Sequence, residues 1–249
     1  MKTANPRMSK PSLPNIELAT LGALERGEKR DKAIRKFLSG WPPFTYGPLR
    51  KWLNDILCAK GQLPLELLSP PWALIENKII KACGKNEEGK IYNSKKGKSL
   101  YEFRENNDIQ FRSHQTLSSL ILPNGTRTTF WSNIIAVSNG RPLLPFFDLR
   151  SSSGLNSNKA KQIAMSIQQR VAIEQDADLD QSGTTPAIIQ VSGSLKDGFT
   201  TQLIENNFHT LLSMSEIEEI VLEVWDDMIR VRQEDQGLER KTGTGGLFD

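Results

Sequence analysis

Apolar residues in the first third of the chain recur every three or four positions, the spacing typical of amphipathic helices. This spacing predicts two short helices within residues 16–41, divided at Gly27. It also predicts one helix over residues 48–60 and another over residues 71–83, each bounded by proline and glycine. Together these elements predict an N-terminal helical module.

Polar segments mark the expected boundaries of this module, which we place at residues 16–84. Residues 1–15 hold three prolines and no helical spacing, which predicts a flexible arm. Residues 85–99 are polar, basic and rich in glycine, which predicts an exposed loop. Residues 236–249 have no apolar periodicity, which predicts a flexible tail.

From residue 100 onward the apolar spacing changes to two, the period of β-strands. The predicted strands cover residues 100–104, 114–122, 126–137, 142–150, 187–193 and 198–206. The sequence Pro-Asn-Gly-Thr at 123–126 predicts a hairpin turn between the second and third of these strands.

Two more helices are predicted within the strand-rich part. One runs from about residue 159 to 174 and is capped by Asn156 or Ser157. The other opens with a capping box of Ser215 and Glu218. Its apolar stripe consists of Ile217, Val221, Val224 and Met228. The order helices, hairpin, strand, helix, strand, helix predicts an α/β or α+β fold with a mixed sheet over residues 100–235.

The composition is that of an ordinary globular protein, with 37% hydrophobic and 24% charged residues. No apolar segment is long enough to cross a bilayer, and the first residues lack the apolar core of a secretory signal. We therefore expect a cytoplasmic protein without membrane contact. Cys58 and Cys83 are predicted to be buried free thiols, and two cysteines with two histidines disfavour a zinc site.

The net charge of +3 conceals an uneven distribution. Residues 1–172 hold 27 Lys and Arg against 13 Asp and Glu, a net charge of +14. Residues 173–249 hold 5 against 16, a net charge of −11. This asymmetry favours a basic surface for nucleic acid, DNA or RNA. The alternative is that the two parts of the chain complement each other within one fold.

Three basic clusters are the candidate contacts with nucleic acid. The first follows Gly27, the second lies in the predicted loop, and the third lies at the start of the helix from residue 159. At a helix start, backbone N–H groups can hold a phosphate. The residues are Lys29, Arg30, Lys32, Arg35, Lys36, Lys90, Lys95, Lys96, Lys98, Arg150, Lys159 and Lys161. A single cluster of this kind is usually a solvated polar face.

The strand at 142–150 ends with an acid and a base two residues apart, Asp148 and Arg150, before a predicted helix. This pattern resembles a degenerate form of the D/E-x-K strand of the restriction-endonuclease-like fold. The resemblance implies a metal-dependent nuclease in which the carboxylate holds Mg²⁺. Arg replaces the expected Lys, and Glu76 or Glu102 would have to complete the site. The favoured alternative is that Asp148 ends a structural strand, with no metal or other cofactor.

The acidic last helix and the tail are the candidate elements for binding another protein. Trp225 lies at the edge of the apolar stripe, and Leu247 and Phe248 form an apolar pair near the chain end. The sequence therefore predicts a nucleic-acid-binding accessory protein in a multi-protein nucleic-acid-processing system. A metal-dependent nuclease is the first alternative, and a structural subunit without nucleic-acid contact is the second.

Overall fold

The structure is a computed structural model that describes residues 13–39, 46–59, 70–128, 130–150, 154–208 and 210–242, with side chains described up to residue 235. Its helices are α1 (Asn15–Gly22), α2 (Glu28–Leu38), α3 (Gly47–Lys51), α4 (Leu53–Leu57), α5 (Trp72–Cys83), α6 (Glu87–Asn106), α7 (Asn158–Ile167), α8 (Ala177–Gln181) and α9 (Met214–Thr242). Its strands are β1 (Ile109–Ser113), β2 (Leu120–Ile121), β3 (Arg127–Thr128), β4 (Ile134–Ser138), β5 (Arg141–Asp148), β6 (Thr185–Ser194) and β7 (Gly198–Glu205).

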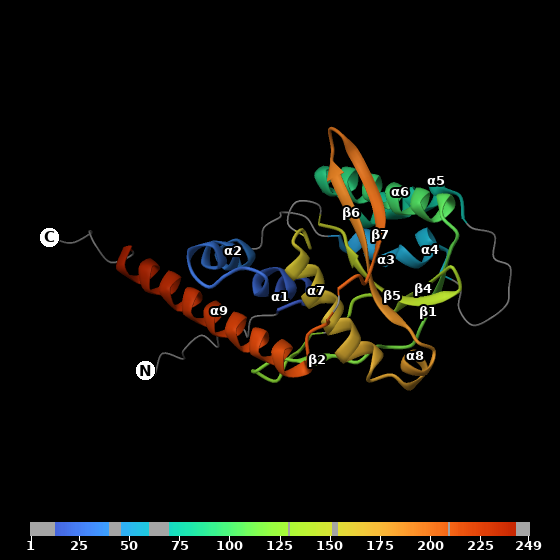
Figure 1. Ribbon diagram of the computed structural model, residues 1–249. Helices are drawn as coiled ribbons and strands as arrows, with labels where there is room; N and C mark the ends of the chain where they lie inside the picture. Colours follow the sequence, from blue (N-terminus) through green and yellow to red (C-terminus); the bar gives the residue numbers. More distant parts are fainter. Residues whose placement is uncertain are drawn as a thin grey trace, which may run out of the picture.

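A mixed sheet in the order β1-β4-β5-β6-β7 occupies the centre of the described chain (Figure 1). β5 and β6 are parallel and are joined through α7, whereas the other neighbours are antiparallel. Asn139 and Gly140 both adopt positive φ in the tight turn between β4 and β5. The β6–β7 hairpin extends beyond the rest of the sheet (Figure 1). These features confirm the predicted mixed α/β fold with an N-terminal helical part.

The two faces of the sheet are covered by different helices. Phe147 and Ile189 pack in a core with residues of α3, α4, α5 and α6. Their neighbours Phe146 and Ile188 pack in a second core with α1, α2, α7 and α9. Because successive strand residues point to opposite faces, these two cores lie on opposite sides of the sheet. The N-terminal helices are therefore divided between both faces instead of packing together as one layer.

Most of the segment 85–99, predicted to be a loop, belongs to the long helix α6, which begins at Glu87. The side chain of Asn86 caps this helix by accepting a hydrogen bond from the N–H of Gly89 at 2.7 Å. Its buried side includes small and polar residues, among them Gly89, Asn93 and Gly97. A Cβ atom at Gly97 would come within 2.9 Å of Trp72, so glycine permits close packing against α5. The hydropathy pattern missed this helix because its buried face begins with residues that are not apolar.

Several predicted strands differ from the structure. Residues 100–104 form the last part of α6 and are not a strand. The turn at 123–126 does join a hairpin, but β2 and β3 pair over only two residues each. β4 pairs with β5 on one side and with β1 on the other, and the hydropathy pattern did not predict β1. The strands predicted at 142–150, 187–193 and 198–206 are confirmed as β5, β6 and β7.

Both terminal segments begin or end differently from the prediction. Leu13 is fully buried, and its carbonyl oxygen accepts a hydrogen bond from Thr128 Oγ1 at 2.7 Å, so the predicted arm is anchored from this residue on. Residues 1–12 lie outside the described residues. At the other end, α9 continues to Thr242, through part of the predicted tail. Residues 243–249 lie outside the described chain.

The last helix opens two residues earlier than predicted. The capping box consists of Ser213 and Glu216 and not of Ser215 and Glu218. The N–H of Ser213 donates to Glu216 Oε2 at 2.7 Å, and the N–H of Glu216 donates to Ser213 Oγ at 3.3 Å. The predicted apolar stripe of this helix, from Ile217 to Met228, is buried. In the first predicted helix of the strand-rich part, α7, Ser157 provides the cap and a π-helical segment over Gln168–Ile173 continues it.

Cys58 and Cys83 are free thiols, as predicted, but they are half-buried and not fully buried. No helix in the described ranges combines the length and the apolarity required to cross a membrane.

Candidate functional site

Asp148 is buried with no exposed surface at the end of β5. Its Oδ1 accepts a hydrogen bond from the N–H of Arg150 at 3.0 Å. Its Oδ2 accepts from the N–H of Leu155 at 2.7 Å and from Gln190 Nε2 at 2.9 Å. A Cβ atom at Gly154 would lie 2.2 Å from Oδ2, so the turn leaves space only for glycine. The carboxylate thus holds together the turn between β5 and α7.

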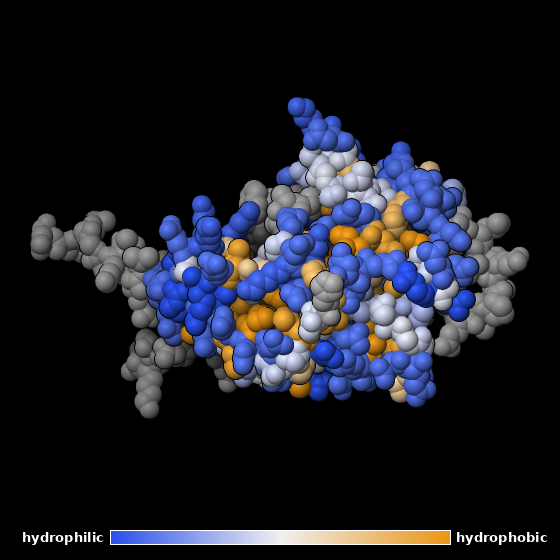
Figure 2. Space-filling view, viewed as in Figure 1, coloured by the Kyte–Doolittle hydropathy of each residue, from blue (hydrophilic) through white to orange (hydrophobic). Residues whose placement is uncertain are grey.

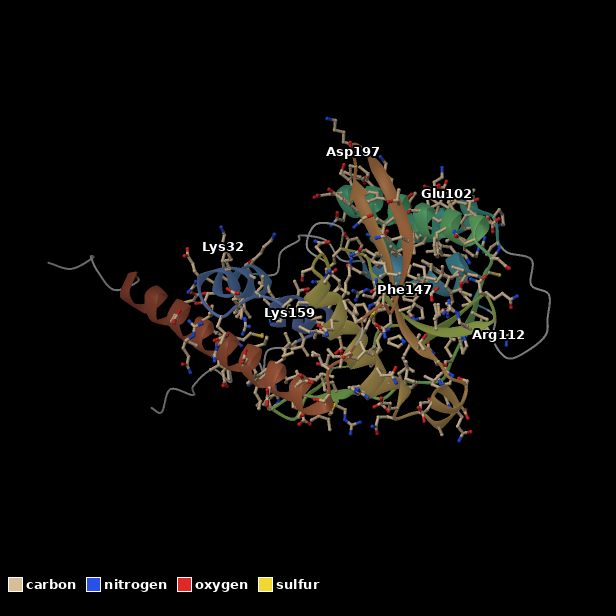
Figure 3. All side chains as sticks on the ribbon, viewed as in Figure 1. Lys32, Glu102, Arg112, Phe147, Lys159 and Asp197 are labelled. Carbon is tan, nitrogen blue, oxygen red and sulfur yellow. The ribbon has the colours of Figure 1, made fainter. Side chains whose placement is uncertain are left out.

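The residues proposed to complete a nuclease site do not gather at Asp148. Glu76 accepts a hydrogen bond from Ser94 Oγ, between α5 and α6. Glu102 is exposed on α6, and Figure 3 shows it well separated from Phe147, the residue that precedes Asp148. Within the described ranges, no three His, Cys, Asp or Glu side chains are grouped so that they could hold a metal ion. This arrangement supports the favoured alternative, in which the carboxylate is structural because N–H donors occupy both of its oxygens.

The basic cluster on α2 pairs with acidic residues of α9. Arg30 is buried and contacts Asp227 at 3.1 Å and Glu223 at 3.3 Å. Arg35 contacts Glu234 at 3.0 Å, near the surface. Figure 2 shows a predominantly hydrophilic surface over α2 and the adjoining part of α9. The oppositely charged parts of the chain therefore neutralise each other in part within the fold, which was the alternative explanation of the charge asymmetry.

Asp227 is the centre of this ion-pair network. It is almost fully buried, and Arg26, Arg30 and Arg230 all contact its carboxylate. Burial raises the pKa of Asp227, but the hydrogen bonds from Arg26 and Arg30 outweigh this effect and leave the pKa below its ordinary value. The carboxylate stays ionised and connects α9 to the N-terminal helices.

The other predicted contacts with nucleic acid lie on three separate elements. Six lysines on α2, α6 and α7 are exposed to solvent, as contacts with nucleic acid would require. They are Lys29, Lys32, Lys36, Lys95, Lys98 and Lys159. Figure 3 shows Lys32 and Lys159 on different helices. Lys98 lies 3.7 Å from Glu102, Lys90 pairs with Glu87, and Lys161 is half-buried.

Lys96 is an exception, because it is buried and does not reach a surface for nucleic acid. Its ammonium group donates to Tyr46 Oη at 2.8 Å and to the carbonyl oxygen of Leu149. The same group lies over the rings of Tyr46 and Phe199, at 4.5 Å and 5.1 Å from their centroids. Burial lowers the pKa of Lys96 to about 8, although the negative charge of Asp148 opposes this change. Lys96 thus ties α6 to the end of β5.

The predicted contacts with a protein partner are also changed. Trp225 was expected at the exposed edge of the apolar stripe of α9. It is buried and packs in the core together with that stripe. Leu247 and Phe248 lie outside the described residues.

A groove of about 910 Å³ opens between the β2–β3 hairpin, the π-helical segment and the start of α9. Three large apolar side chains that are partly exposed line it: Ile121 is 61% exposed, Leu222 is 52% exposed and Met214 is 38% exposed. Exposed apolar residues that adjoin one concave surface are typical of an interaction site. The sequence carried one signal for it, since Leu222 lies outside the buried stripe of α9. The hairpin that places Ile121 opposite this helix required the tertiary structure.

Comparison with known proteins gives two matches. The family model described as "Sliding clamp-binding bacterial toxin SocB" matches residues 16–236. The DNA replication inhibitor toxin SocB of Caulobacter vibrioides (strain NA1000 / CB15N) is 30% identical over 248 residues, which cover 97% of this chain and 98% of that protein. No solved structure matches the chain.

We expect Asp148→Asn to lower the free energy of unfolding by about 2 kcal/mol, because the new amide nitrogen would face an N–H donor and leave it unpaired. Urea denaturation followed by circular dichroism measures this loss. Asp197→Asn is the control, since Asp197 is exposed and accepts a hydrogen bond from Ser194. Equal losses in the two variants would contradict a structural role for Asp148.

Lys96 should make stability depend on pH in the alkaline range. Between pH 7 and pH 9.5 the folded state loses the proton of Lys96 while the unfolded state keeps it, so the contribution of Lys96 to the free energy of unfolding rises. The difference between the unfolding free energies of the unchanged protein and Lys96→Met should therefore change by about 2 kcal/mol over this range. Lys95→Met, at an exposed position of the same helix, should show a constant difference. A constant difference for Lys96→Met as well would refute the lowered pKa.

Proposed function

The chain belongs to the family of the sliding clamp-binding bacterial toxin SocB, and from this membership we propose that it binds a bacterial sliding clamp and thereby inhibits DNA replication. The match over residues 16–236 carries the proposal, because it includes both helical layers and the whole described sheet. In this proposal the protein acts in the cytoplasm, where the clamp encircles DNA.

We place the contact with the clamp at the groove between the β2–β3 hairpin and α9. Ile121 and Leu222 expose apolar surface there, and covering it with a partner would be favourable by roughly 25 cal/mol for each Å² removed from water. Arg127 and Glu218 also line the groove and are exposed, so a polar rim surrounds the apolar centre. This surface replaces the buried Trp225 as the partner-binding element of α9.

Ile121→Asp and Leu222→Asp should each weaken binding to the clamp by at least about tenfold, because an isolated carboxylate would lose its hydration in the contact. The measurement is a calorimetric titration with the sliding clamp of the bacterium that encodes this chain. Leu74→Asp is the matched control, since Leu74 is 56% exposed on α5, outside the groove.

The outcomes of this experiment test clamp binding and the location of the binding surface separately. Absence of binding by the unchanged protein, or no reduction of clamp-dependent primer extension, would overturn the proposed function. Unchanged binding by both groove variants would overturn only the proposed surface. Removal of residues 243–249 tests, in the same titration, whether Leu247 and Phe248 contribute as the sequence predicted.

A second candidate function, binding of nucleic acid, is favoured by one observation. Lys29, Lys32 and Lys36 are exposed on α2, whereas the arginines of the same cluster are paired with acids of α9. A small cationic surface of this kind would bind phosphates without base specificity.

Binding to a DNA duplex should then be weak and should fall steeply between 50 mM and 200 mM salt, because neutralised phosphates release counterions. Fluorescence anisotropy of a labelled duplex measures it. Replacement of the three lysines by glutamine should reduce both the affinity and its dependence on salt. Binding that does not change with salt would contradict this candidate, and clamp binding would be unaffected by that result.

A further inference from the structure

A second, smaller cavity of about 260 Å³ lies beside β5, near its carboxyl end. Residues from distant parts of the chain line it, including Asn15 at the start of α1, Arg50 of α3, Arg127 of β3 and Arg150 after β5. The cavity thus lies where the helices of one face of the sheet meet those of the other. The edge outside the carboxyl ends of parallel strands is a frequent location of ligand sites in open α/β sheets.

Polar groups around this cavity lack the partners that buried groups normally have. Asn15 is only 4% exposed, and neither its Nδ2 nor its Oδ1 has a hydrogen-bond partner among the described residues. The same holds for Arg50 Nε and for Glu17 Oε2. Leaving a buried donor or acceptor unpaired costs about 1–3 kcal/mol each, so such groups in one place call for an explanation. A ligand that accepts hydrogen bonds would provide it for the donors among these groups, Asn15 Nδ2 and Arg50 Nε.

The charged side chains around the cavity favour the binding of an anion. Three arginines line the cavity, Arg50, Arg127 and Arg150, whereas no Asp or Glu is among its lining residues. The nearby carboxylate of Glu17 pairs with Arg150. Arg50 forms no ion pair within the described chain, and its guanidinium lies 4.6 Å from the ring centroid of Trp131. Burial lowers the pKa of Arg50, and the positive charge of Arg150 lowers it further. Arginine does not lose its proton in proteins, so a bound anion would compensate this charge.

The start of α1 adds donors of the same kind. This helix begins at Asn15 without a side-chain cap, since the side chain of the preceding Pro14 offers no acceptor. The first N–H groups of a helix have no partner within the helix, and the helix dipole favours negative charge at this end. Together with the unpaired amide of Asn15 they turn the cavity into a site with donors in several directions.

We propose that this cavity binds a small tetrahedral oxyanion, namely inorganic phosphate or the phosphoryl group of a small phosphate monoester. A phosphoryl group offers three or four oxygens that accept from donors in different planes, whereas the two oxygens of a carboxylate lie in one plane. Arg50 would hold one edge of the anion through paired N–H donors. Asn15 would donate from the opposite helix, so the ligand would join α1 to α3.

The test is the binding of inorganic phosphate by the full chain at constant ionic strength, with sodium chloride as the balancing salt. Calorimetry gives the affinity, and the melting temperature gives an independent measure because a ligand of the folded state raises it. Arg50→Gln should weaken binding by roughly tenfold or more. Arg141→Gln is the control, since Arg141 is exposed and pairs with Glu205 at 2.7 Å.

Asn15→Leu is a second variant that tests the proposal even if Arg50→Gln does not fold. Since the amide of Asn15 has no partner within the described fold, its replacement by an apolar residue of similar size should leave the melting temperature without phosphate equal or higher. Phosphate binding should nevertheless fall roughly tenfold. A lower melting temperature together with unchanged phosphate affinity would show that the amide serves the fold and would overturn the proposal.

Two further arms distinguish the sources of the phosphoryl group. A nucleoside 5′-monophosphate that binds more tightly than inorganic phosphate, with the same loss in Arg50→Gln, supports a monoester as ligand. Equal affinities support the free anion. A melting temperature that rises no more with phosphate than with chloride at the same ionic strength overturns the proposal, and neither result affects binding to the clamp.

Discussion

Both faces of the parallel pair β5–β6 are apolar, and the rest of the molecule is arranged to cover them. Phe146 and Ile188 point to one side, Phe147 and Ile189 to the other. Burying each such side chain contributes roughly 1.5–3 kcal/mol, so neither face can remain in water. Strands covered on both sides have continuous apolar runs in the sequence, and β5 and β6 both show this pattern. The chain supplies one layer from α3 to α6 and the other from α1, α2, α7 and α9.

Buried polar interactions connect the helices to the sheet and, within one layer, to one another. Asp148 closes the turn that leads from β5 to α7, and Lys96 fastens α6 to the same strand end. On the other side of the sheet, Asp227 joins α9 to the N-terminal helices through Arg26 and Arg30. Charged groups are seldom buried without a partner, and each of these buried charges has one. Some of the charged residues that the sequence offered for an external partner therefore form ion pairs and hydrogen bonds within the fold.

The functional proposals are drawn from two kinds of group: apolar side chains that remain exposed, and polar side chains without hydrogen-bond partners in the described fold. Ile121 and Leu222 expose apolar surface in one groove, which we assign to the clamp. Arg50 and Asn15 present unpaired donors in a separate cavity, which we assign to a small oxyanion. Arg127 lines both, so the short β2–β3 hairpin is the element that the two sites share.

The sequence alone predicted the elements that carry an apolar run or stripe: β5, β6, β7, α5, α7 and α9. It also favoured a structural strand end over catalysis for Asp148, because Arg replaces the expected Lys and residues 116–137 contain no acid. That residues 87–106 form a helix became evident in the folded structure, since Asn93, Lys96 and Gly97 are buried by close packing and not by hydrophobicity. The tertiary structure alone decided which charges are paired, and which residues from α1, α3 and β5 meet. Hydropathy reports the free energy of removing one residue from water, whereas pairing and close packing depend on partners that are remote in the chain.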